Sequence, residues 1–334
     1  MTTPLCYGFE YCFHGVGQGL FASGAIYSCR KGTLKYQWVY DCGSSTSQAL
    51  LQQRVAELKA RQPQGDRLHL VTLSHFDRDH ISGICDLLRS FKVLDLLLPY
   101  MPLWKRLLIA FQERITPDED LFRFFINPVE YLADLDGSDI RRVIFVGGSG
   151  EDGPPAPDVP PRRNEPPQDD NDRHWIPQFP TQEPEDEGDA AMLRTSGVRV
   201  DFLRRGGALT LASVWEFVPF NDDSQSPAPP GWESAVAGLR NALIKRQEDD
   251  SRRAALDDLK YTYDKRFTTA CEHCHRLNVG RRAQFAKLFS ERIEPKSASP
   301  SRTNLLSISD AFAEQVSDLW RICEPRHRFA GIFY

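Results

Sequence analysis

Residues 73–83, LSHFDRDHISG, place four side chains that can bind a metal ion within a span of six residues. These side chains are His75, Asp77, Asp79 and His80. Imidazole and carboxylate groups together suit zinc, manganese or iron, and ligands at such short spacing can converge on one ion, or on two ions about 3.5–4 Å apart. The alternative is a polar turn that caps a helix. The density of ligand-type residues favours the metal site.

The segment that carries these residues is expected to lie between a buried strand and a helix. The apolar run LHLVTLS precedes it, ISGICDLLRSF has helical spacing, and VLDLLLP predicts the next strand. This strand-loop-helix-strand order is typical of an α/β sheet, where loops at the carboxyl ends of the strands carry the chemistry.

The flanking sequence predicts further elements of the same α/β unit. Strands are expected in YGFEYCFHGV, GLFASGAIYSC, YQWVYDCG, RRVIFVGG, VRVDFL and SVWEFVPF, and helices at 47–62 and at 104–126 with a break at Pro117.

Composition divides the chain into three parts. Residues 1–148 form the first half of the α/β domain. Residues 149–190 hold ten of the 23 prolines, many acidic residues and few large aliphatic ones, which predicts a disordered insert. Residues 191–334 are expected to continue the same domain, with a charged helical insertion at about 234–292.

The composition and net charge of the chain exclude few classes of function. A net charge of −5 gives no general attraction for nucleic acid or anionic membranes, but it does not exclude a local basic patch. The N-terminus lacks the pattern of a signal peptide, and no apolar run is long enough to span a bilayer. Eight cysteines scattered over 334 residues favour reduced thiols. We therefore expect a cytoplasmic protein without a membrane partner.

The metal-binding segment resembles a known family. SHFDRDHISG is similar to the His-x-His-x-Asp-His signature of the metallo-β-lactamase fold, HGVGQGL resembles its glycine-rich first turn, and WVYDCGSS its strand that ends in Asp-Cys-Gly. The spacing is most similar to the soluble hydrolase domain related to ComEC-like DNA-uptake proteins. The resemblance is specific over residues 7–100 and absent from the insert. It implies an αββα sandwich and a centre of two divalent metal ions.

The resemblance also implies roles for individual residues. His75 would bind the first metal, and Asp79 and His80 the second. Asp77 stands where the family has its second histidine, which makes manganese or iron plausible beside zinc. Asp41 would organise the site close to the metals, so Asp79 and Asp41 are the candidate catalytic residues. For Asp41, a turn residue that ends a strand is an equally good interpretation.

The family takes further metal ligands from the second half of its fold. This sequence does not contain them in the expected sequence context. The remaining candidate histidines are His174 in the insert, His273 and His275 in the helical region, and His327 before the final apolar segment RHRFAGIFY. Asn304 and Ser307 resemble an Asn-x-x-Ser pattern that precedes Thr-Gly-Asp in relatives. The expectation is a fold that is incomplete at the C-terminus, a site completed by a second chain, or lost catalysis.

The function that these residues and the resemblance predict is a metal-dependent hydrolase, with phosphodiesters or nucleic acid favoured as substrate. Relatives with large irregular inserts occur in multi-component bacterial systems, including phage defence, so a protein partner or a homo-oligomer is expected. The alternative is a non-catalytic binding or regulatory subunit that keeps the fold and half of the ligands.

Two other motifs indicate different binding sites. Gly17-x-Gly19-x-x-Ala22 loosely matches a dinucleotide fingerprint, but a strand pattern follows where a helix is needed, so we reject it. Cys271, Cys274 and His275 of CEHCH would share a helix face and could bind zinc. No partner Cys-x-x-Cys exists, and reduced cysteines on a half-buried helix are the favoured interpretation.

Overall fold

The structure, a computed structural model, describes residues 6–29, 32–61, 66–115, 119–148, 175–184, 186–212 and 215–221, and six residues between 232 and 259. Every strand and helix named below belongs to one compact unit, within Met1–Ser224. A second unit, Gln225–Arg328, contains the six isolated residues.

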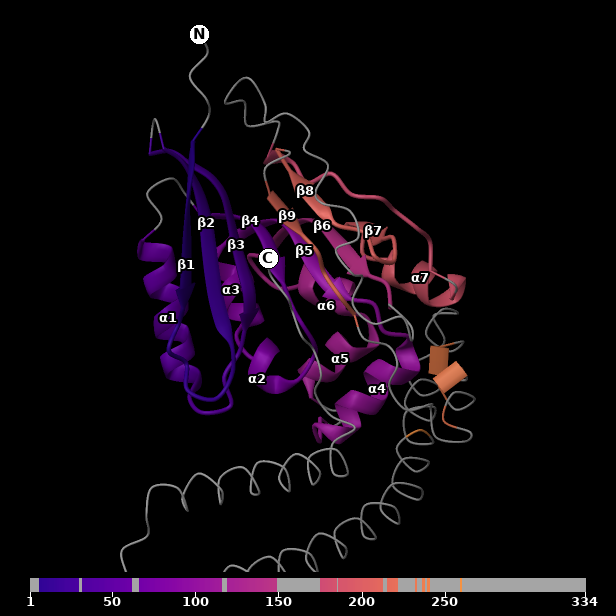
Figure 1. The fold of residues 1–334 in the computed structure, drawn as a ribbon. Helices are drawn as coiled ribbons and strands as arrows, with labels where there is room; N and C mark the ends of the chain where they lie inside the picture. The colour runs from indigo at the N-terminus through magenta and orange to yellow at the C-terminus, as the bar shows by residue number, and fades with distance from the viewer. Residues whose placement is uncertain are drawn as a thin grey trace, which may run out of the picture. The chain divides into compact units, whose positions relative to one another are not determined.

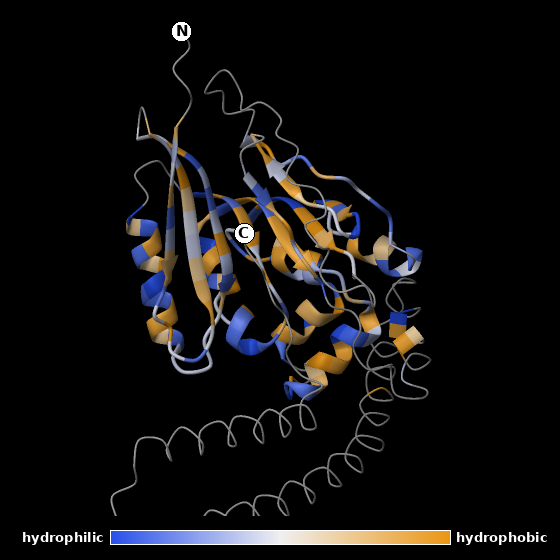
Figure 2. Ribbon diagram, viewed as in Figure 1, coloured by the Kyte–Doolittle hydropathy of each residue, from blue (hydrophilic) through white to orange (hydrophobic). Residues whose placement is uncertain are grey.

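A seven-stranded mixed sheet forms the centre of the first unit (Figure 1). Its strands are β1 (Tyr7–Phe13), β2 (Phe21–Ser28), β3 (Leu34–Cys42), β4 (Arg67–Thr72), β5 (Lys92–Pro99), β6 (Asp139–Val146) and β7 (Arg199–Leu203). They lie side by side in the order of the sequence. The pairs β1–β2 and β2–β3 are antiparallel, and every pair from β3 to β7 is parallel. Parallel strands are buried on both faces, which explains the short apolar runs Leu70–Val71 of β4, Leu96–Leu98 of β5 and Val143–Val146 of β6 (Figure 2).

A small second sheet packs against one face of the large one. It consists of β8 (Leu209–Leu211) and β9 (Trp215–Phe217), which pair antiparallel. Leu209, Leu211 and Phe217 share a hydrophobic core with large-sheet residues such as Trp38 and Leu97. The unit therefore contains two facing sheets.

Helices cover the opposite face of the large sheet and the carboxyl ends of its strands (Figure 1). They are α1 (Gln48–Ala60), α2 (Arg78–Ile81), α3 (Ile84–Ser90), α4 (Leu103–Gln112), α5 (Asp120–Ile126), α6 (Pro128–Ala133) and α7 (Glu187–Leu193). Helix α1 begins at the cap Ser47, whose side chain accepts a hydrogen bond from Leu50 N, and it buries Leu51, Val55 and Leu58. This apolar stripe explains why the segment folds as a helix against the sheet.

The α/β class predicted from the sequence is confirmed, and so are most of the predicted elements. The helix expected at 104–126 is divided into α4 and α5, and Pro117 itself lies outside the described residues. The short elements α6 and β8 were not predicted.

The predicted insert, 149–190, differs from the structure at its C-terminal end. Trp175 is buried in the core between the sheets, and Gln178 and Thr181 form bridges to Thr210 and Leu203. Helix α7 begins at Glu187. The apolar Trp175 and the side-chain cap of α7 at Asp186 order this stretch despite its acidic, proline-rich composition. Residues 149–174 and nearly all of the helical insertion at 234–292 lie outside the described residues.

Among the helices in the described part of the chain, none has the length and apolar character needed to cross a membrane.

Candidate metal centre

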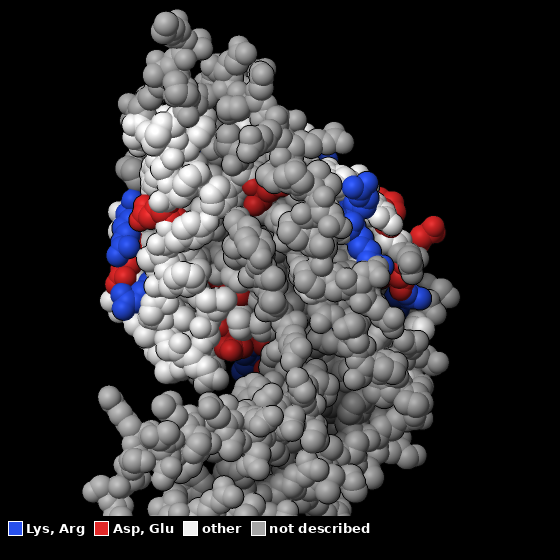
Figure 3. Space-filling model, viewed as in Figure 1, with Lys and Arg blue, Asp and Glu red and all other residues white. Residues whose placement is uncertain are grey.

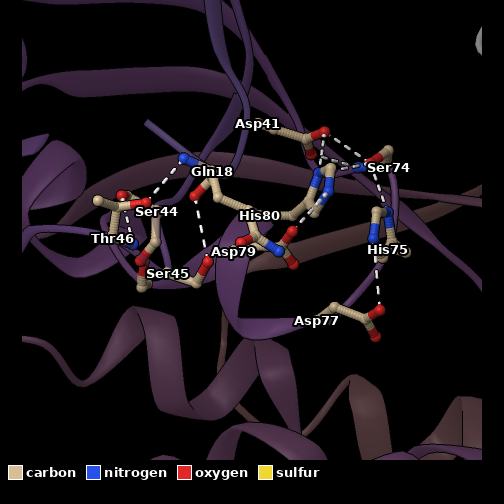
Figure 4. A network of polar contacts seen from close by, with 11 residues as sticks. Gln18, Asp41, Ser44, Ser45, Thr46, Ser74, His75, Asp77, Asp79 and His80 are labelled. Atoms are coloured by element: carbon tan, nitrogen blue, oxygen red, sulfur yellow. Dashed lines mark hydrogen bonds and ion pairs between the residues drawn. The ribbon is translucent and has the colours of Figure 1, made fainter. Parts of the chain in front are cut away.

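Three side chains from the loop after β4 and from α2 converge at the carboxyl end of the sheet (Figure 4). His75, Asp79 and His80 each offer one ligand atom, and these atoms all lie within 4.8 Å of one another. The rings of His75 and His80 are 3.7 Å apart between centroids. Strand β4 holds the start of the loop in the sheet, and the short helix α2 turns Asp79 and His80 back toward His75.

Asp41, the second-last residue of β3, anchors this group from the neighbouring strand. Its side chain is fully buried, and its carboxylate accepts hydrogen bonds from Ser74 N at 2.7 Å, Ser74 Oγ at 2.6 Å and His80 Nδ1 at 2.8 Å. The backbone of Asp41 has a φ of 53°, a left-handed conformation that aspartate tolerates better than most residues. This conformation lies where β3 ends, beside β4, and the loop that follows β4 carries His75.

The two imidazoles are oriented through their Nδ1 atoms. Ser74 Oγ lies 2.8 Å from His75 Nδ1, and Asp41 holds His80 Nδ1, so each ring has its Nε2 atom on the other side. His75 Nε2 lies 3.6 Å from Asp77 Oδ2, and His80 Nε2 lies 3.7 Å from Asp79 Oδ2. Two ligands of one tetrahedral zinc ion are about 3.4 Å apart. Each histidine therefore has a carboxylate at nearly the spacing that a shared ion requires.

The electrostatics of the site concentrate negative charge around His80. Burial lowers the pKa of His80, but the hydrogen bond that His80 donates to Asp41 and the charges of Asp41, Asp79 and Asp77 outweigh burial and leave its pKa above the ordinary value. Acidic side chains are visible in the region of α2 on the face shown in Figure 3. The site therefore attracts a cation, either a proton or a metal ion.

The backbones of three loops meet closely beneath the ligands. Leu20 N donates to Asp79 O at 3.2 Å, and Gly43 N donates to Leu20 O at 3.0 Å. A Cβ atom at Gly43 would collide with the backbone of Asp79 and His80, and one at Gly19 would collide with Gly43 O. Both positions therefore require glycine.

Serine hydroxyls link the same loops. Ser44 N donates to Ser82 Oγ at 2.9 Å, Ser82 Oγ donates to Ser44 O at 3.1 Å, and Ser44 Oγ donates to Val16 O at 2.6 Å. Gln18 N donates to Thr46 Oγ1 at 2.8 Å (Figure 4). Together, these bonds hold the glycine-rich turn before β2 and the loop after β3 against α2.

The structure brings most of the predicted site residues together. His75, Asp79 and His80 form the mutual group, and Asp77 lies beside His75. Asp41 contacts His80 directly, which is the geometry expected of a residue that organises the ligands.

Ser74 was not singled out in the sequence, although it contacts both Asp41 and His75. Its position next to His75 at the end of an apolar strand was the available signal. The other candidate ligands, His174, Cys271, Cys274, His273, His275 and His327, lie outside the described residues, as do Asn304 and Ser307.

Comparison of the chain with protein-family models, with curated proteins and with solved structures found no match.

Proposed function

We propose that the protein is a metal-dependent hydrolase with a metallo-β-lactamase-like αββα architecture, and that His75, Asp79 and His80 bind its metal. The observation that carries the proposal is the convergence of these three ligand atoms within 4.8 Å at the carboxyl end of a parallel sheet. The facing sheets, with helices over one of them, support the architecture.

The donor set fits a divalent cation. Two imidazoles and a carboxylate are the ligands of many catalytic zinc sites, which leave a fourth position open for water or substrate. The Nδ1 contacts of both histidines to Ser74 and Asp41 are also the contacts that orient metal-binding imidazoles in proteins. A bound divalent ion would polarise the substrate and lower the pKa of a water molecule.

The roles of the chain's own residues follow from their contacts. Asp41 fixes the ring of His80 and keeps its Nε2 directed toward Asp79. Ser74 joins Asp41 to His75, so that the two histidines are held by one hydrogen-bonded group. Asp79 and Asp77 supply the carboxylates, and Asp79 is also placed to accept a proton from a bound reactant.

The number of ions and their identity are part of the proposal. With two ions, as the resemblance to the metallo-β-lactamase fold implies, the pairs His75–Asp77 and His80–Asp79 would each hold one ion; with one ion, His75, Asp79 and His80 would share it. Zinc is the first candidate in both cases. Two carboxylates in the ligand set favour harder ions than an all-histidine set does, so manganese and iron are the next candidates.

The proposed substrate is a phosphodiester, with nucleic acid or a nucleotide as the class, because the nearest resemblance is to ComEC-like hydrolase domains. A cytoplasmic location, a protein partner or homo-oligomer, and a place in a multi-component bacterial system such as phage defence belong to the same proposal.

The experiment measures metal content and phosphodiesterase activity on the same preparations. The purified protein is loaded with Zn²⁺ or Mn²⁺, its bound metal is determined by elemental analysis, and hydrolysis of bis-p-nitrophenyl phosphate is followed. We expect at least one bound ion per chain, and loss of both metal and hydrolysis in Asp79→Asn. Asp134→Asn, a surface carboxylate paired with Arg123, is the matched control and should behave as the unaltered protein. A protein that binds neither ion would refute the proposal.

A non-catalytic metal-binding or regulatory subunit is the second candidate. It is favoured by one observation: the only group of three ligands found among the described residues comes from a single segment, His75–His80. Stoichiometric metal binding that depends on Asp79, without hydrolysis, would select this function.

A further inference from the structure

A second group of reactive side chains lies on the α1 side of the sheet. Glu10, Cys12 and His14 occupy alternate positions along β1 and the residue after it, so they share one face of the strand. Ser23 of β2 lies directly opposite Cys12 in the strand register. All four residues line a cavity of ≈ 90 Å³, which is also bounded by residues of α1 and β3.

The thiol, the imidazole and the hydroxyl form a chain of contacts. Cys12 Sγ lies 3.9 Å from His14 Nδ1, and His14 Nε2 lies 2.9 Å from Ser23 Oγ. The imidazole also stacks on Phe21, with ring centroids 4.2 Å apart. This is the arrangement of a nucleophile, a base and a group that orients the base.

The surroundings of His14 favour its neutral form. Burial lowers the pKa of His14, and the positive charges of Arg61 and Arg54 lower it further, against a smaller opposing effect of Glu57. A neutral imidazole can accept a proton from the thiol that it contacts.

Gln37 of β3 provides an independent sign that the cavity takes a ligand. Its side chain is 7% exposed and lines the cavity, yet its Oε1 atom is buried without a hydrogen-bond partner. An unpaired buried acceptor costs free energy that a bound donor would recover. A ligand of this cavity should therefore carry an N–H or O–H group.

We propose that Cys12 is a reactive thiol which forms a mixed disulfide with a low-molecular-weight disulfide that carries N–H groups, and that His14 acts as its base. Thiol–disulfide exchange requires a thiolate, a proton acceptor and access, all of which this site offers. His14 takes the proton of Cys12, and the thiolate attacks one sulfur of the disulfide. The new S–S bond forms as the old one breaks, and the leaving thiolate takes the proton from His14. Gln37 Oε1 accepts a hydrogen bond from the retained half.

The test compares thiols within one protein. Cys29 is exposed, but its thiol is hydrogen-bonded to Cys6, which raises its pKa, so the Cys6→Ala variant is used to make Cys29 a reference. Cystamine is added near pH 7 in the presence of a metal chelator, and mixed disulfides are quantified for each cysteine by peptide mass spectrometry. Because His14 can accept the proton of Cys12 during the reaction, we expect Cys12 to react about tenfold faster than Cys29 although it is less exposed.

Substitution of His14 tests its role as the base of Cys12. His14→Gln should reduce the Cys12 rate about tenfold while the Cys29 rate is unchanged. The fully buried Cys42 should stay unmodified, which shows that the fold is intact. Ser23→Ala is a milder variant that should slow Cys12 by a smaller factor. If Cys12 reacts no faster than Cys29, or if His14→Gln leaves its rate unchanged in a protein whose Cys42 stays protected, the proposal is refuted.

The ligand class is tested through Gln37. Methyl methanethiosulfonate modifies thiols but carries no N–H or O–H group. Gln37→Met should slow the reaction of Cys12 with cystamine several-fold and leave its reaction with methyl methanethiosulfonate unchanged. Equal effects on both reagents, or no effect on either, would overturn the role of Gln37.

Discussion

Among the described residues, the aspartates Asp41 and Asp189 have fully buried side chains, and their surroundings differ in one informative way. Burying a carboxylate is costly unless its charge and its hydrogen-bonding capacity are satisfied. Both residues meet that requirement, but with different partners. The partner determines whether the site can also bind a ligand.

Asp189 of α7 is paired with Arg106 of α4. The guanidinium donates to both carboxylate oxygens at 3.1 and 3.0 Å, and its remaining donors reach the backbone carbonyls of Met101, Phe125 and Ile126. Arg106 is itself 1% exposed. The opposite charges are paired and each guanidinium donor has a protein acceptor, so the pair fastens α7 to α4 and α5 and has no group left for a ligand.

Asp41 is paired with Ser74 and His80 instead. The histidine can gain or lose a proton, and its Nε2 atom points away from Asp41 toward Asp79. The interaction therefore transmits the position and charge of a buried carboxylate to an atom that can bind a metal. A buried ion pair completed by arginine is structural, whereas one completed by histidine can belong to a functional site.

The largest effect is expected from breaking the arginine pair. Asp189→Ala leaves the Arg106 charge buried without a partner and should reduce the free energy of unfolding by about 3–5 kcal/mol. Chemical denaturation measures this loss, and metal affinity of the folded fraction should be unchanged. Replacing both residues, as in Arg106→Met with Asp189→Leu, should restore much of the stability. Asp134→Ala, in an exposed pair, is the control and should cost far less.

The second-largest effect is expected at Asp41, where substitution should change metal affinity. Asp41→Asn preserves a side chain that tolerates the left-handed backbone, but it removes the charge that orients His80. Zn²⁺ affinity, measured by competition with a chromophoric chelator, should fall about 10- to 100-fold. Equal affinity in the variant and the unaltered protein would show that Asp41 is only a turn residue.

A third substitution tests the loops that position the ligands of the Asp41 site. Gly43→Ala inserts a methyl group against the backbone of Asp79 and His80 and should cost about 1–3 kcal/mol of unfolding free energy, with weaker metal binding. Gly8→Ala in β1 is the matched control, because a Cβ atom there has open space around it. If both variants unfold alike, the close contact at Gly43 does not restrain the site.

The smallest effect is expected in the pH dependence of stability, through the contact of His80 with Asp41. The pKa of His80 is raised in the folded protein above the unfolded value of 6.5, so its contribution to the stability of the metal-free protein is complete below that pH. The contribution is lost as pH rises through the raised pKa. Urea unfolding in a chelator should therefore show a larger difference between the unaltered protein and His80→Gln at about pH 6 than at about pH 8.

The fold was predictable from the sequence where periodicity is strong. Apolar runs such as LHLVTLS and VLDLLLP correspond to β4 and β5, and the helical spacing of Leu51, Val55 and Leu58 corresponds to α1. Short elements such as β8 contain too few residues to show a period. In residues 175–190, composition favoured disorder, whereas one buried tryptophan and a capped helix determine the local structure.

The candidate metal centre was predictable because its ligands are neighbours in the chain. His75, Asp79 and His80 lie within one loop and one helical turn, so their proximity is local. The contact of Asp41 with His80 spans 39 residues and depends on the parallel pairing of β3 with β4. Only the resemblance of its Asp-Cys-Gly motif pointed to it.

The Cys12–His14–Ser23 group could not be predicted in the same way. The contact between His14 and Ser23 depends on the register of β1 against β2, in which Cys12 lies opposite Ser23. A shift of one residue would turn these side chains to opposite faces. The strand pattern alone does not determine that register.

The strand order of the large sheet has a consequence for how the chain folds during synthesis. Because β1 to β7 lie in the order of the sequence, each strand pairs with the one made just before it, and no strand waits for a distant partner. Strands β1 to β4 and helix α2, which together position the metal ligands, are complete once the first 81 residues have emerged. The contact of Arg106 with Asp189 spans 83 residues and forms much later. The nascent chain would thus assemble its candidate metal centre well before the buried ion pair that fastens α7.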